Sequence, residues 1–170
     1  GTSCTNPKVT QGKRAYFRAC FIDPFQGAAA AAYAHNELGL RRGAVIFDQT
    51  SEYSMGLTGD FIRSFLALGG AIVAIENYLP GDTDFKTQLA AIAKARPDIL
   101  FMPAYFNEGV QILMQARASG AKYRIMGGDA MDNPTTPSLV REAVEGFMHT
   151  TFPYDPNMPD MTPEAKNFTE

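Results

Sequence analysis

Residues 45–56 read VIFDQTSEYSMG, and their order of apolar and polar residues predicts a strand, a loop and the start of a helix. A strand that passes through a short loop into a helix is half of a βαβ unit, and such units build parallel sheets. In a nucleotide-binding fold the loop would carry glycines, so that the backbone could close around phosphate. This loop carries two acids, a tyrosine and several hydroxyls instead. It therefore indicates an α/β fold with a different kind of ligand.

The same alternation continues along most of the chain. Strands separated by helices of this length predict a parallel sheet, and right-handed crossovers then cover both of its faces. The predicted fold class is an α/β, doubly wound parallel sheet. The predicted strands are residues 15–21, 43–48, 71–75, 98–102, 123–126 and 146–152, and the predicted helices are 26–38, 54–68, a helix capped by 81–84 and ending at 95, 107–119 and 138–144.

The composition is that of a globular protein and excludes several partners. The 170 residues are 45% hydrophobic and 19% charged, and the net charge is −3 with scattered basic residues. A nucleic-acid binder would usually show a basic face, so we expect no nucleic-acid partner. The two cysteines and two histidines form no motif typical of a metal site or a disulfide framework. We therefore expect no metal and no cofactor.

Three loops are predicted to leave the carboxyl ends of strands, where open parallel sheets bind their ligands. They span residues 48–54, 103–107 and 127–133, and none of them contains lysine or arginine. Acids and aromatic rings recur in and beside them. Such an edge suits a small ligand with a positive group and some apolar surface, because tyrosine offers an apolar wall, a hydroxyl and a π-face. The side chains concerned are Asp48, Glu52, Tyr53, Tyr105, Phe106, Asn107, Glu108, Asp129, Met131, Asp132 and Asn133.

Each of these residues also has a purely structural interpretation. Asp48 could cap the following helix or bind loop amides, and Tyr53 could be a hydrophobic staple at the helix entry. Asp129 could be a turn or cap aspartate, and Asp132 is better explained by turn chemistry. The chain lacks GxSxG, GxGxxG, P-loop and HExxH motifs. The sequence therefore gives only weak support to an enzymatic function.

An ordered series of short motifs resembles the branched-chain amino-acid members of the type I periplasmic binding proteins of ABC transporters. No single motif is decisive, but the series spans nearly the whole chain. The motifs are TNPKVT at 5–10, YFRACFIDPFQG at 16–27, DQTSEYSMG at 48–56, GDTDF at 81–85, PD at 97–98, PAYFNE at 103–108, QAR at 115–117, GGDAMD at 127–132 and EG at 145–146.

The resemblance implies two Rossmann-like lobes joined by crossing strands, with the ligand held between them. It assigns residues 1–24 to the end of the first lobe and a crossover strand. Residues 25–152 become the second lobe, and residues 153–170 a truncated crossover back toward the first. The rest of the first lobe would be a partner of this chain within the same protein.

The resemblance also assigns ligand contacts by position. The hydroxyls of Ser3 and Thr5 would receive a substrate carboxylate, and Tyr53 and Tyr105 would form a wall on the second-lobe side. Asp129 stands where the family places an acid that pairs with the α-ammonium of the ligand. We expect no catalytic residue and no metal ligand.

The function implied is that of an extracytoplasmic solute-binding protein. It would capture an amino acid or a similar small carboxylate, pass it to an ABC permease in the membrane, and reside in the periplasm or on the cell surface as a lipoprotein. One alternative is the ligand-sensing domain of a receptor or transcriptional regulator with the same fold. The other is an enzyme of the doubly wound class.

Overall fold

The computed structural model describes residues 1–134 and 141–152. Helices and strands alternate over this range, as the sequence predicts. In chain order the elements are η1 (Pro7–Val9), α1 (Asp23–Ala32), η2 (Tyr33–Glu37), β1 (Arg42–Asp48), α2 (Glu52–Ala67), β2 (Ala71–Tyr78), α3 (Lys86–Ala95), β3 (Ile99–Met102), α4 (Phe106–Ala118), β4 (Arg124–Gly127), η3 (Asp129–Met131), η4 (Arg141–Val144) and β5 (Phe147–His149).

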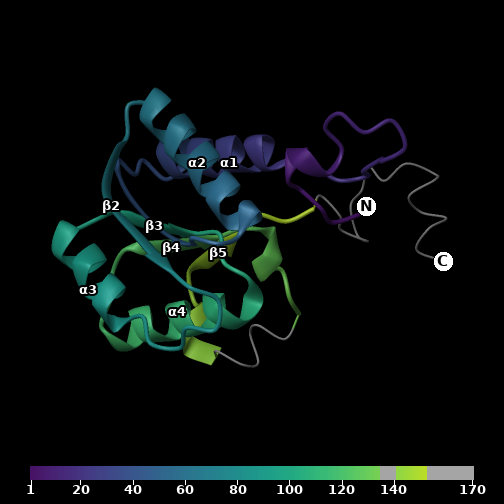
Figure 1. The fold of residues 1–170 in the computed structure, drawn as a ribbon. Helices are drawn as coiled ribbons and strands as arrows, with labels where there is room; N and C mark the ends of the chain where they lie inside the picture. Colours follow the sequence, from purple (N-terminus) through teal and green to yellow (C-terminus); the bar gives the residue numbers. More distant parts are fainter. Residues whose placement is uncertain (135–140, 153–170) are drawn as a thin grey trace.

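The strands form one five-stranded sheet in the order β2-β1-β3-β4-β5, and every pair is parallel. Helices α1 and α2 lie together on one face of this sheet, and α3 and α4 lie on the other (Figure 1). The predicted doubly wound α/β fold is confirmed. Because β1, β3 and β4 are neighbours, the loops that follow them leave the same edge of the sheet.

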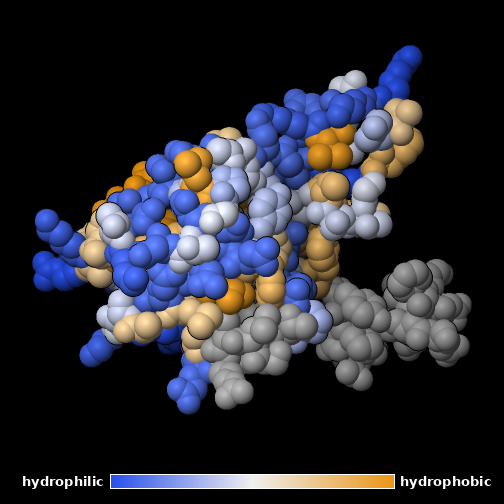
Figure 2. All heavy atoms as spheres, turned by 60° about the horizontal axis from the view of Figure 1, so that its bottom comes forward, coloured by the Kyte–Doolittle hydropathy of each residue, from blue (hydrophilic) through white to orange (hydrophobic). Residues whose placement is uncertain are grey.

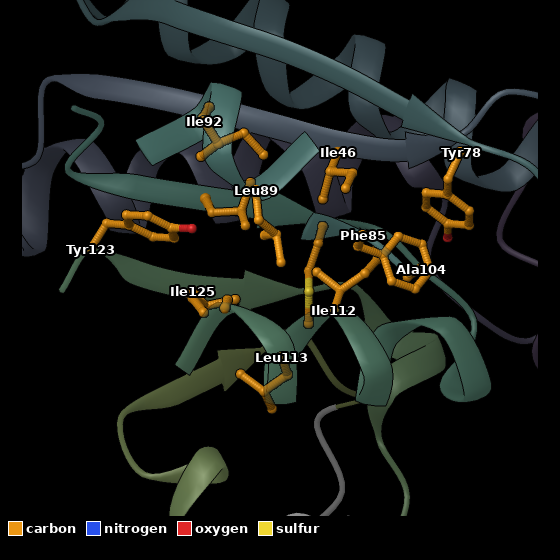
Figure 3. Close-up of a cluster of buried hydrophobic side chains, with 14 of the residues drawn as sticks. Ile46, Tyr78, Phe85, Leu89, Ile92, Ala104, Ile112, Leu113, Tyr123 and Ile125 are labelled. Atoms are coloured by element: carbon orange, nitrogen blue, oxygen red, sulfur yellow. The ribbon is translucent and has the colours of Figure 1, made fainter. Parts of the chain in front are cut away.

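Each face of the sheet has its own apolar core. Beneath α3 and α4, Ile46 and Ile125 of the sheet pack with Leu89 and Leu113 of the helices (Figure 3). Beneath α1 and α2, the ring of Phe101 on β3 stacks on Phe61 of α2 with centroids 4.2 Å apart. Two filled faces explain why the central strands read as nearly continuous apolar runs.

The outer surface is more polar than these cores. Figure 2 shows one face of the molecule, on which hydrophilic residues prevail and hydrophobic ones form small groups. Among the helices of the two described ranges, none combines the length and hydropathy of a membrane span.

Several boundaries differ from the predicted ones for local reasons. Helix α1 begins at Asp23, three residues before the predicted start, because Pro24 in the first turn already has the backbone angle of a helix. Helix α2 begins at Glu52 after the N-cap Ser51, whose side chain accepts a hydrogen bond from the Ser54 amide. The turn at 81–84 precedes α3, but the N-cap position itself is Phe85, without a side-chain cap.

The predicted strand over residues 15–21 is wrong. These residues form no ladder in the structure, and the rings of Tyr16 and Phe17 are exposed. Isolated backbone bonds, such as that from Ala19 to Gly1, hold the segment together with the Arg18 guanidinium, which donates to the carbonyls of residues 4, 5 and 7 and to the Thr10 hydroxyl. A β-rich composition becomes a strand only beside another strand, and the described chain provides none here.

Two predictions near the carboxyl end are met in part. The predicted strand over 146–152 corresponds to β5, which is shorter, and the predicted helix over 138–144 overlaps η4. Positions 138–140 of that helix lie outside the described residues. The predicted crossover at 153–170 lies outside them as well.

Candidate functional site

The three loops predicted to carry the site meet at one cavity beside the carboxyl ends of β1, β3 and β4. The cavity has a volume of about 830 Å³. All five residues assigned from the resemblance line it, although they come from distant parts of the sequence. The lining residues are Ser3, Cys4, Thr5, Asn6, Val9, Asp48, Thr50, Ser51, Glu52, Tyr53, Tyr105, Asp129, Ala130, Asp132 and Phe152.

Asp129 is held by two side chains from other elements. The Tyr53 hydroxyl donates to its Oδ1 at 2.8 Å, and Nε2 of Gln26 donates to the same oxygen at 2.9 Å. The Asp129 amide in turn donates to Oε1 of Gln26 at 3.1 Å. Within the described chain no donor contacts the other carboxylate oxygen, Oδ2. One oxygen of Asp129 is thus fixed by two donors, and the residue lines the cavity.

A close backbone approach makes this arrangement possible. Gly128 lies so near that a Cβ at this position would be 2.3 Å from the Tyr53 hydroxyl and 3.2 Å from Oε1 of Gln26. Any side chain at 128 would therefore push both residues away from Asp129. The glycine before the acid has a packing reason that its sequence context did not reveal.

Tyr53 and Tyr105 form an aromatic wall. Their ring centroids are 5.3 Å apart with an interplanar angle of 33°. Tyr53 is half-buried, and Tyr105 is 49% exposed. Burial, followed by the nearby Asp129 charge, raises the pKa of Tyr53, so its hydroxyl stays protonated and can donate. Since Tyr53 is the second residue of α2, it does not occupy the position of a hydrophobic staple.

The amino-terminal segment also lines the cavity. Ser3 is exposed there and Thr5 is buried, and both line the cavity. The segment is attached to α2 by Asn6, whose amide donates to the Glu52 carbonyl at 3.0 Å. Lys8 adds an exposed ion pair with the Glu52 carboxylate. Ser3 and Thr5 thus line the same cavity as the two tyrosines, and their role in binding remains a prediction.

Asp48 and Glu52 line the same cavity, and each already has a polar partner from the chain. Oδ1 of Asp48 accepts bonds from both the amide and the hydroxyl of Thr50, each at 2.8 Å. Glu52 is paired with Lys8. In residues 1–134 and 141–152, no group of three or more His, Cys, Asp or Glu side chains could hold a metal ion.

A second acid, Asp23, is buried close to two residues of the cavity, Thr5 and Asp129. It is completely inaccessible, and neither carboxylate oxygen has a hydrogen-bond partner in the described part of the chain. Burial raises the pKa of Asp23 to about 6, and the charges of Asp129 and Asp60 add to this rise. The nearby Thr5 hydroxyl and Arg18 offset part of it, although the hydroxyl is not in hydrogen-bonding geometry with the carboxylate. Asp23 is therefore a buried acid that keeps its proton up to about pH 6.

This acid makes stability depend on pH. The folded pKa, about 6, lies above the ordinary value of 3.8, so the native state holds its proton to higher pH than the unfolded state. Stability is then lost as pH rises through this window. Relative to wild type, the free energy of unfolding of Asp23→Asn should be about 2 kcal/mol larger at about pH 7.5 than it is at about pH 4.5. Urea unfolding of the full-length protein at both values measures this gain.

Glu37→Gln is the matched control, because Glu37 is an exposed acid in η2. The difference in free energy of unfolding between Glu37→Gln and wild type should be the same at both pH values. An Asp23→Asn difference that is equally constant would contradict the burial argument.

Sequence reasoning missed Gln26 and Thr150. Gln26 is 2% exposed and contacts Asp129, 103 positions away. The Thr150 hydroxyl donates to Gln26 Oε1 at 2.6 Å, across 124 positions. A glutamine in a helix and a threonine after a strand, so far apart in sequence, form no recognisable sequence motif. Only the packing of α1 against α2 and the end of β5 brings them together.

Comparison with known proteins gives relatives over nearly the whole chain. Residues 3–170 match the family model described as periplasmic binding protein. The leucine-specific-binding protein of Salmonella typhimurium is 32% identical over 168 residues, which are 98% of this chain and 44% of that protein. The Leu/Ile/Val-binding protein of Escherichia coli is 31% identical over 150 residues, or 87% of this chain and 40% of that protein. The chain thus spans less than half the length of these curated relatives.

Solved structures agree with this assignment. A leucine-binding protein from Thermotoga maritima superposes with a TM-score of 0.90 at 41% identity, over 96% of this chain and 46% of that one. The branched-chain amino-acid transporter substrate-binding protein of Streptococcus pneumoniae, solved with isoleucine, gives a TM-score of 0.82 at 28% identity, with the same coverage of both chains. With a family match that extends over residues 3–170, the chain belongs to the periplasmic binding protein family.

Proposed function

We propose that the full-length protein containing this chain is the solute-binding component of an ABC transporter. It captures an amino acid, of the branched-chain type, between two lobes and delivers it to a membrane permease. No chemical step is involved, so the protein is a carrier and no enzyme. The permease recognises the ligand-bound protein by the closed arrangement of its two lobes.

The observation that carries this proposal is the state of Asp129 at the cavity. Its Oδ1 is held by Tyr53 and Gln26, while its Oδ2 receives no hydrogen bond from the described residues. The lining contributed by the described chain contains acids and aromatic rings but no lysine or arginine. A carboxylate fixed in this way suits an ammonium group, because charge-assisted hydrogen bonds are strong when their geometry is fixed. The tyrosine wall suits the apolar part of the same molecule.

The relatives support the class of ligand. The Salmonella and Escherichia proteins are named for leucine, isoleucine and valine, and the Streptococcus structure contains isoleucine. We infer that Ser3 and Thr5 receive the carboxylate of such an amino acid and that Asp129 receives its ammonium. Tyr53 and Tyr105 then cover it from the second-lobe side.

The division of the chain and its location belong to the same proposal. Residues 1–24 end the first lobe and cross over, residues 25–152 form the second lobe, and residues 153–170 lead back. The remainder of the first lobe completes the cavity. The protein works outside the cytoplasm, in the periplasm or as a lipoprotein at the cell surface.

Calorimetry of the full-length protein against the standard amino acids tests the proposal. We expect leucine, isoleucine or valine to bind with a Kd of about 10 µM or tighter. Two leucine analogues separate the contributions of the two lobes. 4-Methylpentanoate lacks the ammonium and 3-methylbutylamine lacks the carboxylate, so each should bind at least about a hundredfold more weakly than leucine.

A full-length protein that binds none of the standard amino acids would refute the proposal. Equal affinity for leucine and 4-methylpentanoate would instead mean that Asp129 does not bind the ammonium group of the ligand. In that case the class of ligand would be a carboxylate without an amino group.

A further inference from the structure

We propose that Gln26 is a positioning residue that sets the affinity of the site by holding the Asp129 carboxylate in place. This inference rests on the proposed function, since it concerns the group that receives the ammonium. Gln26 does not line the cavity, so it would act through Asp129 and without contact to the ligand.

The contacts between Gln26 and Asp129 are reciprocal. The amide nitrogen of Gln26 donates to the Asp129 carboxylate, and its oxygen accepts from the Asp129 backbone amide. A flipped amide would set NH₂ against N–H and oxygen against carboxylate, so only one orientation satisfies both contacts. Backbone and side chain of Asp129 are therefore fixed by one group. This leaves Asp129 little freedom to lose when a ligand binds.

Gln26 also connects the site to both segments that lead away from the lobe. It lies in the first half of α1, just after residues 17–22, and its oxygen accepts from Thr150, just after β5. These two segments lie side by side, because the ring of Phe21 stacks on Phe152 with centroids 4.7 Å apart. The acid of the site and the two connecting segments thus share one hydrogen-bonded network. A change at Gln26 should reach the ligand only through that network.

A double-mutant cycle in the full-length protein tests the proposal. The variants are Gln26→Met, Asp129→Ala and the two combined, and the probe is whichever of leucine, isoleucine and valine binds wild type tightest. Methionine keeps the length of the side chain but removes the donor and the acceptor. Gln111→Met is the matched control, because Gln111 is an exposed glutamine on α4. Calorimetry gives the Kd, and circular dichroism checks that each variant is folded.

We expect Gln26→Met to weaken binding about tenfold and Gln111→Met to leave it unchanged. In the Asp129→Ala background, Gln26→Met should change the Kd by no more than about twofold, because the group it positions is gone. A merely structural role would give the same loss in both backgrounds.

Thr150→Val provides a second variant if Gln26→Met does not fold. It removes the hydroxyl that orients the Gln26 oxygen, and we expect a loss of about threefold that also disappears in the Asp129→Ala background. A loss that persists without Asp129, or a Gln26→Met protein that binds like Gln111→Met, overturns the inference while leaving the proposed function intact. Wild-type protein that binds no branched-chain amino acid refutes the proposed function, and this inference falls with it.

Discussion

Asp129→Ala in the full-length protein is expected to lose about 3–5 kcal/mol of binding free energy for a branched-chain amino acid. The loss is large because the remaining ammonium would be buried in the closed cavity without its counter-charge. The Tyr53 hydroxyl and the Gln26 amide would also lose the acceptor that they share. Calorimetry with leucine measures the change as a rise in Kd of roughly two to three and a half orders of magnitude.

Asp132→Ala is the control that separates a specific ion pair from the general negative charge of this edge. Asp132 lines the same cavity, but its carboxylate already accepts a hydrogen bond from the Thr151 hydroxyl. Its removal should change the Kd by less than about fivefold. If both variants lose the same affinity, the site attracts its ligand through charge alone, and Asp129 has no special role.

The parallel sheet could be predicted from the sequence because its strands are buried on both sides. Runs such as 43–47 and 99–102 are apolar throughout, and helices of the expected length separate them. Residues 15–21 have a similar composition but form no strand, because strand formation depends on a neighbour that composition does not reveal. The start of α1 differs for a simpler reason: the sequence predicts a helix from residue 26, but Asp23-Pro24 already forms its first turn.

The candidate site was predictable as far as topology determines it. Loops that follow adjacent parallel strands must meet, and this brings Tyr53, Tyr105 and Asp129 to one cavity. The side chains that orient Asp129 could not be predicted, because Gln26 and Gly128 act through contacts of a few ångströms across α1, α2 and β4. Neither the buried state of Asp23 nor its raised pKa follows from its neighbours in sequence, since both depend on what packs against it.

Phe101→Ala should be the most damaging substitution for stability, costing about 3–5 kcal/mol of the free energy of unfolding. Phe101 is fully buried on β3, between β1 and β4, where it pairs with Val45 and Met126. Its ring stacks on Phe61 of α2, so its loss would open a cavity beneath the helix that carries Tyr53. A total stability of about 5–15 kcal/mol is typical, so a large part of it would be lost. Urea unfolding of the full-length protein measures the change.

Two further variants show whether packing is the cause. Phe101→Leu keeps most of the apolar volume and should cost about 1–1.5 kcal/mol, while Leu66→Ala, on the outer side of α2 with Leu66 50% exposed, should cost less than about 1 kcal/mol. Because the stacked rings do not line the cavity, Phe101→Ala should leave the leucine affinity of the folded protein within about threefold of wild type. Asp129→Ala should lose far more affinity than Phe101→Ala and less stability. A Phe101→Ala protein that is as stable as Leu66→Ala would mean that the face beneath α1 and α2 is not the tightly packed core that the stacked rings indicate.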